Sequence, residues 1–424
     1  MSADSAPRRP RVAALFTECR HRSHAHVILE NFLEPYLFNG EWTDPGVEVV
    51  CFWQDQTPER DLAAAVAKKY GIRQCATVRE ALCLGGEKLA VDAVLSIAEH
   101  GEYPTNARGQ KEYPRKRFFD EIVKVFRETG QVAPVFTDKH LSYRWDWAKE
   151  MYDTARELRI PFMAGSSVPL AERQPPVELP RGADIEEAVA IHGGPFEVYD
   201  FHALEVLQSF MEFRKGGETG VARVQLLAGD ALWRAAEAGL WSESLAEAAR
   251  AADLGPDRPP IRKAVDAAGQ GGSVPAPWGI LVQYRDGRRG ASLRFQRTDI
   301  RWSFACRIRG AAEPLATRFY VGPWDNRNLF KALSHAIQDH FRERRAPYPI
   351  ERTLLTTGIL EAAVTSRHEG GSWVETPHLA LPYRSRDFRK LREQGKSWKI
   401  LTEALPEPFG FDFPVLSPPA PRKR

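Results

Sequence analysis

Short apolar runs alternate with helix-like stretches along the first 165 residues of the chain. The runs at 11–16, 47–53, 91–97, 134–137 and 161–164 have the length and continuous hydrophobicity of strands that are buried on both faces. Stretches in which apolar residues recur at helical spacing lie between them. Strands that alternate with helices in this way predict a parallel, doubly wound, Rossmann-like sheet of the α/β class.

The pattern changes beyond residue 168. The segment 169–184 contains four prolines and predicts an interdomain linker, and the segment 253–270, rich in proline, glycine and charge, predicts a loop. Strand-like runs follow at 279–285, 291–296, 301–307 and 317–321. Helices are predicted at 199–214, at 229–239, in a third stretch that ends near 252, at 328–344 and at 350–366. This order predicts an α+β domain whose open, mostly antiparallel sheet carries helices on one face.

These patterns divide the chain into four parts. A flexible leader is expected at 1–10, a Rossmann-like domain of the dinucleotide-binding type at 11–168, and an α+β domain at 169–404. The last segment, 405–424, is rich in proline, ends in basic residues and is expected to be extended. We expect the α+β domain to contact the substrate and to form a homo-oligomer through the free face of its sheet.

Composition excludes several classes of protein. The 424 residues include 59 Lys plus Arg and 56 Asp plus Glu, and a net charge of +3 gives no broad positive field for nucleic acid. No apolar run is long enough for a membrane span or a secretion signal. The five cysteines form no CxxC pair and no even-numbered disulfide framework. We therefore expect a cytoplasmic protein with no membrane or nucleic-acid partner.

The turn after the first predicted strand lacks the glycines of a dinucleotide-binding loop. Such a loop has the pattern GxGxxG, because glycine lets the backbone approach a pyrophosphate at a helix N-terminus. Here the turn contains Arg20, Arg22, Ser23, His24 and His26. The first four side chains could bind a cofactor phosphate without glycines, the two histidines could bind a metal, or the turn could be a solvated polar loop. Histidines two apart do not share a helical face, which favours the polar loop over the metal.

Three further residues are candidates for binding a cofactor. Asp55 follows the second predicted strand, where a carboxylate can accept a hydrogen bond from a ribose hydroxyl or can cap the next helix. Glu99 and His100 follow the strand at 91–97 and open a long polar segment, 98–116. Ligands of α/β sheets bind beyond the carboxyl ends of the strands, so this segment is a candidate for function.

The order of elements and two motifs resemble the Gfo/Idh/MocA family, which includes glucose–fructose oxidoreductase and inositol dehydrogenase. Lys139 follows a buried strand, as does the lysine of the family's Glu-Lys-Pro triplet. The glycine pair 193–194 precedes His202, and Glu205 follows three residues later, as in the family's substrate domain. The resemblance covers roughly 11–385 and implies a Rossmann domain joined to a domain with an open antiparallel sheet.

The resemblance also implies an activity. It implies an oxidoreductase that moves hydride between NAD or NADP and a hydroxyl or ketone of a sugar- or polyol-like small molecule. Lys139 would lie beside the nicotinamide and the substrate, His202 would exchange a proton with the substrate, and Glu205 would orient His202. The sequence departs from the family pattern at His140, where the family has proline, and at Val198, where the family often has an acid.

Two alternatives keep the same fold. A metal-assisted lyase, hydratase or hydrolase would use a divalent metal instead of a nicotinamide, with His100, His140 and His202 as candidate ligands. No HxH or HExxH spacing joins these histidines, so no metal site is assigned. A non-catalytic scaffold would retain the fold alone.

Overall fold

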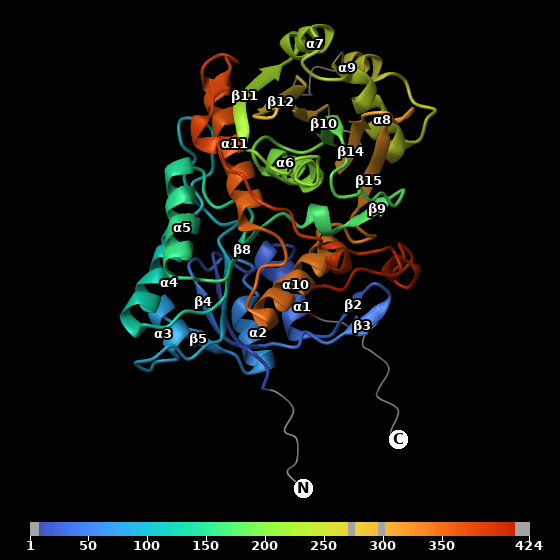
Figure 1. Cartoon of the computed structure of the whole chain (residues 1–424). Coiled ribbons are helices and arrows are strands. Elements are labelled where there is room, and N and C mark those ends of the chain that lie inside the picture. The colour runs from blue at the N-terminus through green and yellow to red at the C-terminus, as the bar shows by residue number, and fades with distance from the viewer. Residues whose placement is uncertain (1–7, 270–275, 296–301, 412–424) are drawn as a thin grey trace.

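The computed structural model describes residues 8–269, 276–295 and 302–411 (Figure 1). The first seven residues of the predicted leader and residues 412–424 of the predicted tail lie outside the described residues. Within the described ranges, no helix combines the length and the apolar character needed to cross a bilayer.

A six-stranded parallel sheet forms the first unit. The apolar runs predict five of its strands, whereas the short strand at 73–75 has no counterpart in the prediction. Its strands lie in the order β5-β4-β1-β6-β7-β8, and every pair runs parallel. The central strands are almost wholly buried because helices cover both faces of the sheet. The bounds are β1 (Arg11–Phe16), β4 (Glu48–Gln54), β5 (Arg73–Cys75), β6 (Ala93–Ile97), β7 (Val135–Asp138) and β8 (Phe162–Gly165).

Five helices connect these strands and end where the sequence predicts. Ser23 and Thr77 accept backbone hydrogen bonds as N-caps, and Gly71 ends its helix in the left-handed conformation with φ of 68°. The bounds are α1 (His24–Leu33), α2 (Ala63–Tyr70), α3 (Val78–Cys83), α4 (Arg115–Thr129) and α5 (Trp145–Glu157). Helices α3, α4 and α5 cover one face of the sheet, whereas α1 and α2 cover the other.

The second unit contains an eight-stranded sheet in the order β16-β11-β12-β13-β10-β14-β15-β9. All neighbours are antiparallel except β10 and β13, which confirms the predicted open, mostly antiparallel sheet. The strands β10 and β11 have no counterpart in the prediction, and β9 lies inside the predicted linker. The bounds are β9 (Glu172–Gln174), β10 (Ile185–His192), β11 (Val221–Ala228), β12 (Trp278–Tyr284), β13 (Arg289–Arg294), β14 (Trp302–Ile308), β15 (Leu315–Tyr320) and β16 (Val374–Glu375).

Helices cover both faces of this second sheet, so the expectation of one covered face is wrong. Helices α6 (Val198–Met211) and α11 (Ile350–His368) cover one face. Helices α7 (Asp230–Glu237), α8 (Glu243–Leu254) and α9 (Ile261–Gly269) pack their apolar sides on the other. The last of these lies within the predicted loop at 253–270, which is a second correction. The predicted homo-oligomer stays a prediction, and these three helices would form part of any interface on that face.

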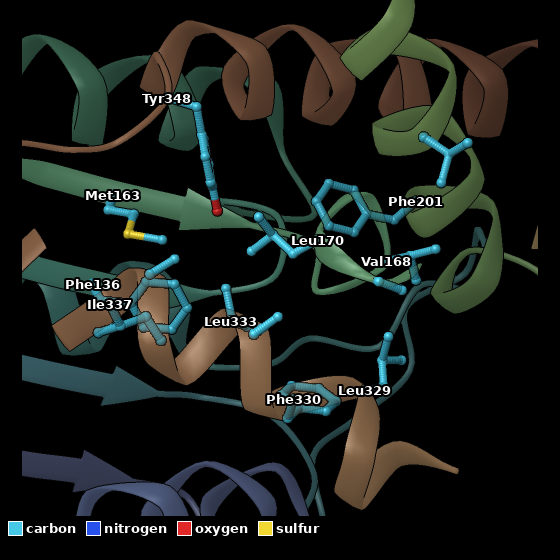
Figure 2. Packing of buried hydrophobic residues seen from close by; sticks show 14 of the residues in the cluster. Phe136, Met163, Val168, Leu170, Phe201, Leu329, Phe330, Leu333, Ile337 and Tyr348 are labelled. Carbon is cyan, nitrogen blue, oxygen red and sulfur yellow. The ribbon is translucent and has the colours of Figure 1, made fainter. Parts of the chain in front are cut away.

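Helix α10 (Asn326–Glu343) follows the second sheet in sequence but packs on the first unit beside α1 (Figure 1). Its residues Leu333 and Ile337 lie near Phe136 of β7 and Met163 of β8 (Figure 2). The hairpin of β2 (Tyr36–Phe38) and β3 (Glu41–Thr43) packs beside it, and short 3₁₀ turns lie at Val168–Leu170, Pro377–Leu379, Arg389–Leu391 and Ser397–Lys399. The domain division after residue 168 stays a prediction, because the two units share this core.

We expect the substitution Leu333→Ala to lower the free energy of unfolding by ~2–5 kcal/mol, because it opens a cavity in this shared core. Leu333 is fully buried. Urea unfolding followed by circular dichroism measures the change. Ile400→Ala is the matched control, since Ile400 is 47% exposed and its truncation should change stability by ~0.5 kcal/mol or less. Equal effects of the two substitutions would contradict the packing described for α10.

Candidate active site

Buried polar side chains gather where the parallel strands end and meet α6. Glu99 follows β6, Lys139 follows β7 and Ser166 follows β8, while His202 lies in the first turns of α6. All four side chains are buried. The carboxyl ends of neighbouring parallel strands lie at one edge of the sheet, which explains why residues distant in sequence meet here.

The Glu99 carboxylate forms ion pairs with two positively charged side chains. The Nζ atom of Lys139 lies 2.9 Å from Oε1, and the Arg115 guanidinium donates a hydrogen bond to Oε2. The side chains of Lys139 and Glu99 are only 5% and 3% exposed. Burial alone would raise the pKa of Glu99, but the charges of Lys139 and Arg115 outweigh it and hold the pKa well below the usual value. The carboxylate is therefore ionised and fixes the position of the lysine.

The backbone turns sharply at Lys139. This residue has a φ of 62°, and its carbonyl accepts a hydrogen bond from the Gly165 N–H at 3.2 Å. A Cβ atom on Gly165 would lie 2.9 Å from Thr353 Oγ1 and 3.0 Å from Glu205 Oε2. The close approach of these groups thus requires glycine at this position. Figure 2 shows the Tyr348 side chain directed toward the end of the same strand, β8.

His202 is held by a serine that the sequence analysis did not assign. Its Nδ1 atom lies 2.6 Å from Ser166 Oγ, and the Ser166 N–H donates to Glu205 Oε2 at 3.5 Å. Glu205 also accepts a hydrogen bond from Thr356 Oγ1 at 2.7 Å. The predicted link between Glu205 and His202 therefore runs through Ser166. Burial and then the charge of Lys139 lower the pKa of His202 well below its usual value, so the imidazole is neutral.

The remaining histidines of this edge contact one another and their neighbours. His24 Nδ1 lies 2.5 Å from Asp138 Oδ2, and the rings of His24 and His100 meet edge to face at 4.8 Å. His140 Nε2 lies 3.3 Å from the Arg115 guanidinium. Burial lowers the pKa of His100 to about 3. Across the described ranges, no three His, Cys, Asp or Glu side chains are grouped so as to hold a metal ion, so the metal alternative has no support there.

The residues predicted to bind a cofactor are engaged within the chain. Arg20 pairs with Glu18 at 2.6 Å, and Arg22 donates to Glu407 at 3.1 Å. The Ser23 hydroxyl caps α1 by accepting the His26 N–H. Asp55 accepts hydrogen bonds from the Tyr103 hydroxyl at 2.6 Å and from Arg117 at 2.5 Å. If these four side chains bound a cofactor as predicted, the contacts just described would first have to break.

A pocket of about 740 Å³ lies at the same edge, beside the turn after β1. Its lining includes the carboxylates of Glu18, Glu59 and Glu102 and a single cation, Arg20. A pyrophosphate carries negative charge and would be repelled by this excess of carboxylates. The lack of glycine in the turn also keeps the backbone from approaching a phosphate. These residues therefore do not fit a cofactor pyrophosphate bound in the way that a glycine-rich loop binds it.

Glu197 is a further candidate that the sequence analysis missed. It precedes α6 with a φ of 68°, is buried, and accepts a hydrogen bond from the Lys111 N–H at 3.2 Å. Burial raises its pKa to about 7. A carboxyl group that titrates near neutral pH is suited to proton exchange. The polar segment 98–116, which the sequence marks as a candidate, supplies the Lys111 contact.

Comparisons with solved structures support the fold. GenD2 from gentamicin A biosynthesis in complex with NAD matches with a TM-score of 0.54 and 12% identity, over 88% of this chain and 99% of that chain. Scyllo-inositol dehydrogenase from Lactobacillus casei matches with a TM-score of 0.52 and 9% identity, over 87% and 98%. Levoglucosan dehydrogenase in complex with NADH and L-sorbose matches with a TM-score of 0.50 and 13% identity, over 87% and 99%. No family model and no curated protein sequence matches the chain.

These likenesses define the class of fold. The chain has the fold of the Gfo/Idh/MocA-type dehydrogenases, which confirms at the level of structure the resemblance seen in the motifs. The likeness covers both the parallel sheet and the mostly antiparallel sheet, because nearly the whole length of each solved chain is matched. Sequence identities of 9–13% show the fold alone.

We expect Glu99→Gln to lower the free energy of unfolding at pH 7 by about 3 kcal/mol or more, because Lys139 and Arg115 lose their anionic partner. The pKa of Glu99 is depressed in the folded state, so its contribution is present above the ordinary pKa of 4.5 and is lost as the pH falls below it. The difference from the wild type should therefore shrink from pH 7 to pH 3, as measured by urea unfolding. Glu102→Gln, at an exposed neighbour, should have little effect. A constant difference across this pH range would contradict the assignment.

Proposed function

We propose that the chain is an oxidoreductase-like enzyme that acts on a hydroxyl or ketone of a sugar- or polyol-like small molecule. The observation that carries this proposal is the buried Lys139, fixed by Glu99 at the strand ends near the neutral His202. The fold agrees with it, since the solved structures of this fold include GenD2 with NAD and levoglucosan dehydrogenase with NADH and L-sorbose.

The two side chains have complementary roles in moving a proton. Neutral His202, oriented by Ser166, can accept the proton of a substrate hydroxyl as a carbonyl forms. The Lys139 ammonium has three N–H donors, of which one is directed at Glu99. The other two can donate to the substrate oxygen, whose charge changes during the reaction. In the reverse direction the same two groups return the proton to a ketone oxygen.

Hydride transfer also needs a carrier. NAD or NADP is the carrier that we propose, because the solved structures of this fold include complexes with NAD and NADH. The turn after β1 does not fit the pyrophosphate of such a carrier as a glycine-rich loop would. Cofactor binding is therefore the first part of the proposal to measure.

A specific observation favours a second candidate, a nicotinamide-independent lyase or hydratase. The side chains of Arg20, Arg22, Ser23 and Asp55 are already engaged by other residues of the chain. Lys139 and His202 would then move a proton without any change in oxidation state. Both candidates use the same polar cluster, so binding of the nicotinamide distinguishes them.

We expect NAD or NADP to raise the melting temperature of the purified full-length chain, because a ligand that binds only the folded state stabilises it. The gain in free energy is ~2.7 kcal/mol at a ligand concentration of 100 times Kd. Differential scanning fluorimetry with NAD, NADP and NADH measures the shift, and quenching of NADH fluorescence checks it. AMP is the matched control without nicotinamide. No shift and no quenching up to millimolar cofactor would contradict the oxidoreductase and favour the second candidate.

Lys139→Met and His202→Gln should each lower kcat/KM by ~10²–10⁴-fold, because each removes a group that handles the substrate proton. The assay screens inositols and simple sugars with NAD and NADP and follows absorbance of the reduced nicotinamide. Lys124→Met and His368→Gln, at exposed positions, are the matched controls and should retain activity. Full activity in both cluster variants would show that the cluster is not catalytic.

A further inference from the structure

A second cavity lies away from the polar cluster, between the segment after β9, the end of α6 and the segment 387–392. Its volume is about 270 Å³, just below the range of ~300–1,000 Å³ that is usual for small-molecule sites, so it suits a compact ligand. Phe210 lines the cavity, whereas His202 of the polar cluster precedes it by eight residues on the same helix. Eight residues span about 12 Å along a helix, so the two sites are separate.

Two buried arginines line this cavity and share one acidic partner. The side chains of Arg173 and Arg392 are 6% and 3% exposed, whereas the Glu178 side chain is 42% exposed. Arg392 donates a hydrogen bond to Glu178, and Arg173 lies 3.7 Å from the same carboxylate. The Nε atoms of both arginines are buried and have no hydrogen-bond partner among the described residues. The positive charges of the two guanidinium groups are therefore balanced by one carboxylate, which is itself partly exposed to solvent.

The other charged side chains that line the cavity do not offset this excess of positive charge. Arg389 pairs with Asp387, and Arg181 donates a hydrogen bond to the Ser385 carbonyl at 2.9 Å. Burying a cation without a full counter-charge costs free energy. Accordingly, burial, followed by the repulsion of Arg392, lowers the pKa of Arg173 well below its usual value. The cavity therefore has room for an anion that the described residues do not supply.

Aromatic rings form the apolar part of the same cavity. Phe210, Phe213 and Phe388 line it, and the Arg173 guanidinium carbon lies 4.2 Å from the centre of the Phe210 ring. Stacking on the ring holds the guanidinium in one orientation. A ligand that fits both features has an oxyanion at one end and a compact apolar body at the other.

We propose that this cavity is a binding site for a small organic acid whose carboxylate or phosphate accepts hydrogen bonds from Arg173 and Arg392. The apolar body of the acid packs on the phenylalanine rings. A neutral polyol offers no charge to balance the two guanidiniums, so this site differs in ligand class from the polar cluster at Lys139. The inference is independent of the proposed oxidoreductase activity.

Isothermal titration calorimetry of the full-length chain with benzoate and phenyl phosphate tests the proposal. At least one of these acids should bind, the tighter one identifies the preferred head group, and neutral benzyl alcohol should not bind. Arg173→Met and Arg392→Met should each weaken binding by about tenfold or more, since a charge-assisted hydrogen bond is lost. Lys139→Met should leave the affinity unchanged, which separates this site from the polar cluster.

Melting temperatures without ligand check that the variants fold. Arg173→Met removes a poorly compensated buried charge and should not lower the melting temperature. If Arg392→Met does not fold, Arg392→Gln retains polar contacts and replaces it. The proposal is overturned if neither acid binds more tightly than benzyl alcohol, if both arginine variants bind as the wild type does, or if Lys139→Met abolishes binding.

Discussion

The ion pair between Glu99 and Lys139 is the interaction on which the rest of the polar cluster depends. Glu99 follows β6, Lys139 follows β7, and Arg115 begins α4, so a single carboxylate connects three elements at the edge of the sheet. Removing these charges from water is costly, and the mutual attraction offsets that cost only while the geometry is kept. The arrangement therefore fixes the lysine more firmly than packing of a flexible side chain could.

The cluster also depends on the second unit, because His202 and Glu205 come from α6. Ser166 of the first unit contacts both of them, and Thr356 of α11 completes the set. The two units thus position each other's polar groups across a buried interface. A change in their relative placement would separate the lysine from the histidine without altering either unit.

The sequence predicts five strands of the parallel sheet because each forms a largely apolar, mostly buried run, and it misses β5, whose residues Arg73, Gln74 and Cys75 form no such run. It misses β10, which begins Ile185-Glu186-Glu187, and β11, where Arg223 and Gln225 interrupt the apolar pattern. It identifies Lys139 and His202 by motif but not Ser166 or Glu197. Ser166 and Glu197 contact residues that are far apart from them in the chain, and such pairs cannot be predicted from local sequence patterns.

The return of α10 to the first unit has a consequence for synthesis of the protein. The parallel sheet is complete at Gly165, but 160 residues separate it from Asn326, where the helix that covers part of its core begins. At ~5–20 residues per second, a ribosome adds these residues in about 8–32 seconds. During that time Phe136 and Met163 lack their native cover, so the nascent chain is exposed to association with chaperones before release.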